Sequence, residues 1–280
     1  MNEKTLFVSD LDGTLMRGDE TLSAYTVQAL NRLIEQGMAF TYATARSIES
    51  ARVITGGLRM KLPVITRNGA VLADNATGRH LEKALFTAEE VALLKEWLPE
   101  LPENGFVSCF TGERMIKAAV TGKHTPAFQG YIDYYKDKSP AMEMVDDMDG
   151  LFFGEPGYVT LIGEKEEIAP FYERMKKYPG WECVFQKDTY RDEFWLEICP
   201  RNSTKAKAIL RMKEEMGFQR LVVFGDSLND VPMFRAADEA YAVAGAMPEL
   251  KEIATGMIGS NEEDAVARYL ENRYQTEGIL

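Results

Sequence analysis

The amino-acid sequence predicts an α/β protein, built on a doubly wound parallel sheet and interrupted by an α+β domain. Strand and helix patterns alternate over the first 80 or so residues, and the same alternation returns after about residue 200. Such alternation is typical of a parallel sheet that helices cover on both faces. The stretch between contains hairpins beside helices, which is typical of an α+β domain. We therefore expect a discontinuous core domain, 1–81 with 190–280, and an inserted domain, 82–189.

The first segment has a strand–helix–strand–helix–strand pattern. The expected elements are a strand at 6–8, a helix capped by Thr21 or Ser23 and closed by Gly37, a strand at 38–43, a short helix that Ser47 starts, and a strand at 62–66. Serine and threonine hydroxyls accept hydrogen bonds from the free N–H groups of a first helical turn, and glycine commonly ends a helix. Pro63 fits only the start or the edge of the third strand, because proline cannot donate to a sheet ladder.

The rest of the chain first changes and then resumes this pattern. In the middle we expect a helix at 87–98, a hairpin of 106–110 and 115–118 around Thr111-Gly112, a strand at 158–162, a helix at 165–177, and strands at 181–186 and 193–198. Afterwards we expect a helix capped by Ser203 that contains Lys205, a strand at 221–224, a helix from about 231 and a strand at 240–243.

Composition excludes several classes of function. The chain has 280 residues and a formal net charge of −12, so no excess of lysine and arginine is available for nucleic acid or an anionic membrane. Three cysteines without metal-ligand spacing predict reduced thiols. No apolar stretch approaches the roughly 20 residues that span a bilayer, and no signal peptide is recognisable. We expect a cytoplasmic monomer or homodimer.

Acidic residues follow two of the expected strands. Asp10 and Asp12 come directly after the strand at 6–8, and Asp226 and Asp230 come after the strand at 221–224. Ligands bind outside the carboxyl ends of the strands of an open parallel sheet. Carboxylates crowded at such an edge are costly unless a cation lies among them. The sequence therefore predicts an acidic site for a hard cation, most simply Mg²⁺.

The spacing of Asp10 and Asp12 suits phosphoryl transfer. Residues two apart in an extended chain point the same way, so both could serve one reaction centre. The first carboxylate could attack phosphorus, and the second could protonate the leaving oxygen and then activate water. An EF-hand does not fit, because Leu15 stands where that loop needs glycine and Thr21 where it needs glutamate. The chain has no phosphate loop of the Gly-x-x-x-x-Gly-Lys-Ser/Thr type. A plain acidic turn remains the alternative for this motif taken alone.

Residues 10–15, Asp-Leu-Asp-Gly-Thr-Leu, resemble the first motif of the haloacid dehalogenase (HAD) superfamily of phosphohydrolases. P-type ATPases of that superfamily have no acid at the second position, so Asp12 favours a hydrolase or a mutase. Residues 225–230, Gly-Asp-Ser-Leu-Asn-Asp, resemble the fourth motif. Residues 67–70, Arg-Asn-Gly-Ala, match the Cof-like branch (type IIB), whose C2B cap is inserted at the place predicted here. Thr44-Ala45-Arg46 departs from the branch's usual Thr-Gly-Arg.

The resemblance implies a role for each motif residue. The implied catalytic residues are Asp10, Asp12, Thr44 and Lys205. The implied substrate-binding residues are Arg46, Asn68 and Asn229. The implied metal-binding residues are Asp10, Asp12 through its backbone carbonyl, Asp226, and Asp230, which would orient a metal-bound water. Several of them also have a purely structural interpretation: a strand-end threonine, a surface ion pair for Arg46, a turn for Asn68. Lys207 is the rival of Lys205 as the cation beside Asp10.

The resemblance thus implies a Mg²⁺-dependent phosphatase for small phosphorylated metabolites, most simply sugar phosphates, with an aspartyl-phosphate intermediate. The inserted domain would close over the substrate and supply specificity. A phosphosugar mutase would use the same core chemistry. A non-catalytic sensor of phosphorylated metabolites is the alternative outside catalysis.

Overall fold

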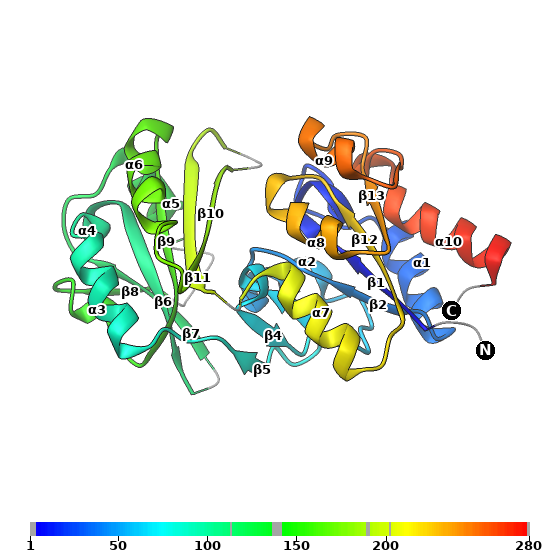
Figure 1. The fold of residues 1–280 in the computed structure, drawn as a ribbon, viewed down its shortest axis with the longest axis horizontal. Coiled ribbons are helices and arrows are strands. Elements are labelled where there is room, and N and C mark those ends of the chain that lie inside the picture. Colours follow the sequence, from blue (N-terminus) through cyan, green and yellow to red (C-terminus); the bar gives the residue numbers. More distant parts are fainter. Residues whose placement is uncertain (1–3, 113, 136–141, 189–190, 202, 279–280) are drawn as a thin grey trace. The chain divides into compact units, whose positions relative to one another are not determined.

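The computed structural model describes residues 4–112, 114–135, 142–188, 191–201 and 203–278 (Figure 1). The chain divides by its internal contacts into two compact units. We call Met1–Glu82 with Thr204–Leu280 the core unit, and Lys83–Ser203 the inserted unit. The inserted unit ends later than the 189 expected from the sequence. Strand β11 (Phe194–Pro200) pairs with β9 and β10 and so belongs to the inserted sheet.

The core unit contains a five-stranded sheet in the order β14-β13-β12-β1-β2. Its strands are β1 (Thr5–Ser9), β2 (Ala39–Tyr42), β12 (Arg220–Gly225), β13 (Glu239–Ala242) and β14 (Gly256–Met257), and each pairs in parallel with its neighbour. The chain runs from β1 outward to β2 on one side and, later, from β12 outward to β14 on the other. The strand order therefore reverses between β1 and β12, as in a doubly wound fold. The predicted fold class is confirmed.

The third predicted strand joins this sheet only loosely. Strand β3 (Val64–Thr66) makes one parallel bridge to the end of β2, between Ala43 and Ile65. It forms a second sheet with β4 (Val71–Ala73) and β5 (His80–Lys83), and it pairs with β4 antiparallel. The 3-10 turn η2 (Arg67–Gly69) reverses the chain between them. The strand begins just after Pro63, in keeping with the missing donor of proline.

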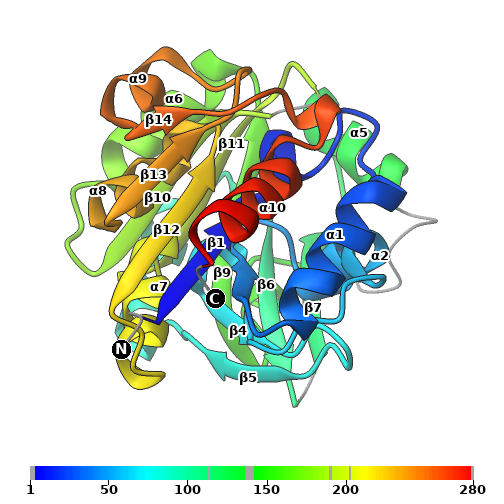
Figure 2. The same ribbon diagram turned by 90° about the vertical axis from the view of Figure 1, so that its right-hand side faces the viewer.

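Helices cover both faces of the core sheet. They are α1 (Ala24–Glu35), α2 (Ile48–Thr55), α7 (Lys205–Glu215), α8 (Val231–Ala236), α9 (Pro248–Ile253) and α10 (Ala265–Glu277). Val8 and Val223 pack in one core cluster with Ile209 of α7. On the other face the ring of Phe224 lies 5.5 Å from that of Tyr269 in α10. Figure 2 shows α10 beside α1.

Side-chain caps start three core helices. Ser23 accepts from the backbone N–H of Thr26, and Ser47 accepts from that of Ser50, as the sequence predicts. For α7 the prediction of Ser203 is wrong, because Thr204 is the cap and accepts from the N–H of Lys207. The shift makes Lys205 the first residue of α7.

The inserted unit is a six-stranded sheet with helices, in the order β10-β11-β9-β6-β7-β8. Its elements are α3 (Ala88–Trp97), α4 (Leu101–Asn104), β6 (Gly105–Thr111), β7 (Arg114–Val120), α5 (Pro126–Tyr135), β8 (Met142–Val145), β9 (Glu155–Gly163), α6 (Lys165–Met175), β10 (Trp181–Lys187) and β11. All pairs are antiparallel except β7 with β8. The predicted hairpin of β6 and β7 is confirmed, and Thr87 caps α3 in a capping box.

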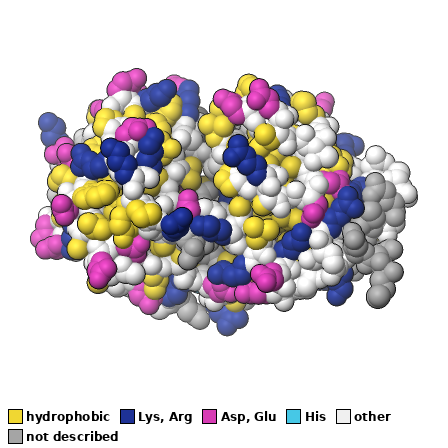
Figure 3. All heavy atoms as spheres, in the orientation of Figure 1, with side chains coloured by type: hydrophobic (Ala, Val, Ile, Leu, Met, Phe, Trp, Pro, Cys, Tyr) yellow, Lys and Arg dark blue, Asp and Glu magenta, His cyan; other side chains and the backbone are white. Residues whose placement is uncertain are grey.

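Charge is intermixed on one face of the molecule. On the face drawn in Figure 3, lysine and arginine side chains stand among aspartate and glutamate side chains. Among the described residues, no helix combines the length and the apolar character needed to cross a bilayer.

Candidate active site

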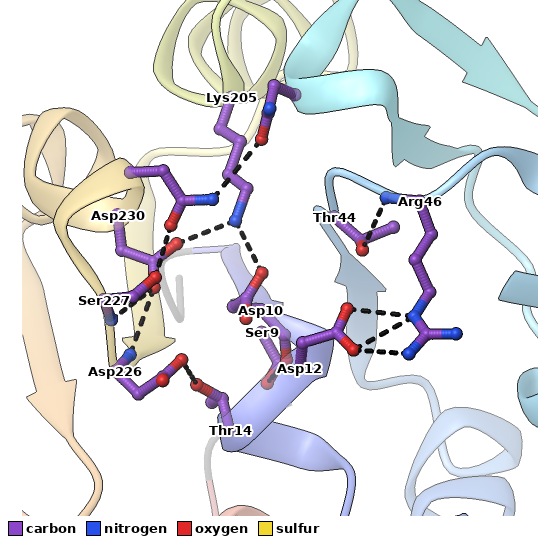
Figure 4. Close-up of polar contacts among 12 residues, drawn as sticks. Ser9, Asp10, Asp12, Thr14, Thr44, Arg46, Lys205, Asp226, Ser227 and Asp230 are labelled. Atoms are coloured by element: carbon purple, nitrogen blue, oxygen red, sulfur yellow. Dashed lines mark hydrogen bonds and ion pairs between the residues drawn. The ribbon is translucent and has the colours of Figure 1, made fainter. Parts of the chain in front are cut away.

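The carboxyl ends of β1 and β12 bring three acids together (Figure 4). Asp10 follows β1, and its backbone N–H donates to the carbonyl of Phe224 in β12 over 2.9 Å. Asp226 follows β12, and Asp230 closes the 3-10 turn η4 (Leu228–Asp230). One carboxylate oxygen from each of the three acids lies within 4.8 Å of the other two. Residues far apart in sequence therefore meet at the point where the strand order reverses.

Lys205 lies among these acids. Its Nζ is 2.5 Å from Asp10 Oδ1 and 2.8 Å from Asp230 Oδ1, and its side chain is buried. The rival Lys207 is exposed. The N-terminus of α7 lies close to the turn η2, because a Cβ on Gly69 would lie 2.3 Å from the carbonyl oxygen of Thr204. Gly69 also has a φ of 101°, so only glycine fits this contact without strain.

The site holds three carboxylates against one ammonium group. Burial raises the pKa of Asp10 well above its usual range, opposed by Lys205 and reinforced by the neighbouring carboxylates. Burial and then Asp230 raise the pKa of Asp226 to about 7. Burial alone would lower the pKa of Lys205, but Asp10 and Asp230 hold it above its usual value. The ammonium group stays charged, and the carboxylates remain short of positive charge.

The turn that follows β1 passes close to Asp226. Residues Leu11–Leu15 form a single wide turn, η1, in which Gly13 has a φ of 75°. A Cβ on Gly13 would lie 2.5 Å from Asp226 Oδ2, so the turn needs glycine for both its conformation and its close approach. The hydroxyl of Thr14 donates to Asp226 Oδ1 over 2.8 Å. The sequence reasoning gave Thr14 no role, although its place inside the first motif was a usable signal.

Asp12 faces a different cation from Asp10. Arg46 Nη2 is 2.7 Å from Asp12 Oδ1, and Arg46 Nε is 3.0 Å from each carboxylate oxygen (Figure 4). The two aspartates thus have different cationic partners, although the backbone is extended at both of them. That both serve one reaction centre stays a prediction. Arg46 Nη2 also lies 3.3 Å from Glu20 Oε2, a contact that sequence reasoning missed.

The remaining predicted residues form a hydrogen-bonded rim. Thr44 is buried; its backbone N–H donates to Ile65, and its hydroxyl accepts from the N–H of Arg46 over 3.1 Å. Asn68 has a φ of 51° and donates its N–H to the carbonyl of Thr44. Asn229 Nδ2 is 3.5 Å from Asn68 Oδ1. The rim thus connects the ends of β2, β3 and β12.

The acid cluster suits a divalent cation with oxygen ligands. Mg²⁺ prefers carboxylate, carbonyl and water oxygens. Asp230 uses Oδ1 on Lys205 and Oδ2 on the backbone N–H groups of Asp226 and Ser227, which lie 3.1 and 3.2 Å away. Asp10 and Asp226 are therefore the acids best placed to bind a metal, and Asp230 holds them and Lys205 in position.

A doubly wound sheet with these groups at its reversal point is the core of a HAD-type hydrolase. A family model described as haloacid dehalogenase-like hydrolase matches residues 7–270. The chain therefore belongs to the haloacid dehalogenase-like hydrolases. The predicted membership of the HAD superfamily is confirmed, and relatives that are named phosphatases agree with the predicted class of enzyme, a phosphoric monoester hydrolase.

Three similar proteins illustrate the match. The 5-amino-6-(5-phospho-D-ribitylamino)uracil phosphatase YwtE of Bacillus subtilis is 24% identical, over 94% of this chain and 95% of that protein. The HMP-PP phosphatase of Yersinia enterocolitica is 26% identical, over 94% and 93%. A solved sugar phosphatase of HAD subclass IIB, BT4131, has a TM-score of 0.73 at 20% identity, over 99% of this chain and all of that one.

Proposed function

We propose that this protein is a Mg²⁺-dependent phosphatase that hydrolyses sugar phosphates through an aspartyl phosphate on Asp10. The observation that carries the proposal is the 2.5 Å contact of Lys205 Nζ with Asp10 Oδ1, inside a cluster of carboxylates. Relatives whose names specify small phosphorylated compounds, and a structural neighbour named a sugar phosphatase, support this substrate class.

In the first step the Asp10 carboxylate attacks phosphorus, and the bond from phosphorus to the sugar oxygen breaks. Lys205 would offset the repulsion between this carboxylate and the phosphate, and the hydroxyl of Thr44 would donate to a phosphoryl oxygen. Fixed charges aimed at a developing transition state are among the largest catalytic contributions, about 10²–10³-fold for one donor.

Asp12 would give its proton to the leaving sugar oxygen in that step. In the second step it would take a proton from water, which attacks phosphorus and releases inorganic phosphate and free Asp10. Arg46 faces Asp12 and, with Asn68 and Asn229, supplies polar groups for the sugar.

Asp10, Asp226 and the backbone carbonyl of Asp12 would hold the magnesium ion. The ion supplies positive charge that neutralises the phosphate and the crowded carboxylates. Lys205 and Asp230 fix the positions of these ligands through their mutual contact.

The experiment is a screen of phosphate release from hexose and pentose monophosphates with Mg²⁺, with Asp10→Asn as the matched isosteric control. We expect phosphate from at least one sugar phosphate without a bisphosphate activator, and almost none from the variant. Release that depends on a bisphosphate would favour the mutase, and binding without release would favour the sensor. Full turnover by Asp10→Asn would refute the nucleophile.

A further inference from the structure

The loop at residues 17–21 is a closed turn with an unusual residue in it. The N–H of Arg17 donates to the carbonyl of Thr21, and the N–H of Glu20 donates to the carbonyl of Arg17, each over 3.0 Å. Glu20 has a φ of 61°, in the left-handed region that residues other than glycine rarely adopt. The turn fixes a glutamate at a position where glycine would be the easy choice. A glutamate at such a position suggests that its side chain has a function that glycine could not provide.

Residues near the start of α10 hold this loop in place. Arg17 Nη2 is 3.4 Å from Asp264 Oδ2, and the N–H of Gly18 donates to Glu262 Oε1 over 2.6 Å. Asp264 is buried and also accepts from the hydroxyls of Ser23 and Thr26. These contacts hold the loop without Arg46, so the position of Glu20 does not depend on Arg46 alone.

Glu20 and Asp12 share one guanidinium group. Nη2 of Arg46 is 3.3 Å from Glu20 Oε2 and 2.7 Å from Asp12 Oδ1. The side chains of Arg46 and Asp12 are 15% and 19% exposed, whereas that of Glu20 is 37% exposed. Charge-assisted contacts of a guanidinium fix geometry as well as energy.

We infer that Glu20 is a positioning residue: it holds the Arg46 guanidinium and, through it, orients Asp12 toward the leaving oxygen. The inference rests on the proposed function, in which Asp12 serves that oxygen. Asp12 must leave part of its contact with Arg46 to reach the substrate. Glu20 then still accepts a hydrogen bond from the guanidinium, so Arg46 keeps its position when the Asp12 carboxylate moves toward the substrate.

This role predicts an effect that depends on the leaving group. The alkoxide of a sugar hydroxyl is a poor leaving group and needs a correctly placed acid to protonate it, whereas p-nitrophenolate leaves without one. Misplacing Asp12 should therefore slow the first step, release of the leaving group, for a sugar phosphate and spare that step for p-nitrophenyl phosphate. The second step, hydrolysis of the aspartyl phosphate, is common to both substrates. A loop residue that merely supports the fold would affect both substrates alike.

The test compares Glu20→Gln and Glu20→Gly on both substrates. The glutamine keeps the shape without the charge, and the glycine keeps the left-handed backbone without the side chain. The measurement is release of the leaving group in a single turnover, which reports the first step alone. We expect its rate for the sugar phosphate to fall about two- to fivefold, the range of a partly exposed ion pair. The single-turnover rate of p-nitrophenolate release should not change. Glu49→Gln is the matched control: Glu49 lies in α2, pairs with His80 at 3.8 Å, and should affect neither substrate.

A second arm places Glu20→Gln in an Asp12→Asn background and again follows release of the leaving group in a single turnover. The first step should slow no further there, because both changes remove one function. Equal losses on the two substrates, no loss, or full additivity with Asp12→Asn would overturn the inference. If wild type turns over and Asp10→Asn does not, such a result rejects only the role of Glu20. If wild type releases no phosphate from any substrate, the proposed function and this inference both fail.

Discussion

The core unit contains two charged clusters with opposite balances of charge: one has more cationic than acidic groups, and the other has more acidic than cationic groups. In β13, Glu239 lies between Arg273, whose Nη1 and Nη2 are 2.7 and 2.8 Å from its oxygens, and Arg220. The hydrogen bonds from Arg273 lower the pKa of Glu239 to about 2. At the active site three carboxylates share the ammonium group of Lys205, and the pKa of Asp226 is raised to about 7.

The difference separates a cluster that supports the fold from one that supports chemistry. A carboxylate with two cationic partners stabilises the folded protein wherever it is ionised. Buried carboxylates without enough positive charge cost stability until a cation binds. Sites that trade stability for activity in this way are common in enzymes. The comparison yields predictions for each cluster.

The largest effect is expected for Asp10→Asn. The amide has the same shape but cannot attack phosphorus, so kcat should fall about a thousandfold or more. Steady-state phosphate release, with circular dichroism to check the fold, measures this. A loss of less than about tenfold would show that the unbalanced cluster is not the reaction centre.

Asp226→Asn should separate activity from stability. Its amide oxygen can still accept from Thr14, but one unbalanced charge is gone. We expect activity to fall about 10²-fold, as for loss of one electrostatic group, while the metal-free protein gains about 1–3 kcal/mol in free energy of unfolding. Urea unfolding in the presence of a chelator measures the gain. A variant that is less stable than wild type without metal would contradict the comparison.

The same charge predicts a pH dependence. The pKa of Asp226 is about 7 in the folded protein, and an unfolded aspartate titrates near about 3.9. The stability that protonated Asp226 contributes is fully present below the pKa of the unfolded state and is lost as pH rises through the pKa of the folded state. Metal-free wild type should therefore weaken relative to Asp226→Asn between about pH 4 and pH 7. Mg²⁺ should reverse this loss at the upper end. A constant difference between the two proteins would contradict the raised pKa.

The smallest effect concerns the balanced cluster. Glu239→Gln should lower the free energy of unfolding by about 1–2 kcal/mol at neutral pH, after allowance for solvent screening, and should leave kcat unchanged. The folded pKa is about 2, against about 4.3 when unfolded. The contribution is therefore present above the unfolded value and disappears as pH falls through the folded one. A loss of activity without a loss of stability would show that the two clusters are not independent.

Local chemistry made much of the fold predictable from the sequence. Ser23 and Ser47 cap the helices that the sequence placed after them, because a cap depends only on its neighbours. The acidic residues at the ends of β1 and β12 meet because parallel strands share a carboxyl edge. The caps depend on residues close in sequence, and the meeting of the acidic residues follows from a general rule for parallel sheets.

What the sequence did not predict depends on partners far along the chain. The pairing of β11 with β9 placed residues after 190 in the inserted unit, and β3 turned back onto β4. The contacts of Arg46 with Glu20 and of Asp264 with Arg17 join loops that no local pattern connects. Neighbouring Ser203 and Thr204 are equivalent capping candidates, and only packing selects Thr204.

The most direct test is to trap the phosphorylated enzyme. In Asp12→Asn the second step should stall, because no base activates water. After a brief reaction with p-nitrophenyl phosphate, whose leaving group needs no acid, and an acid quench, peptide mass spectrometry should find one phosphoryl group on Asp10, in the tryptic peptide of residues 5–17. Phosphate release by wild type with no phosphoryl group on Asp10 in this variant, or with the group on another residue, would contradict the account.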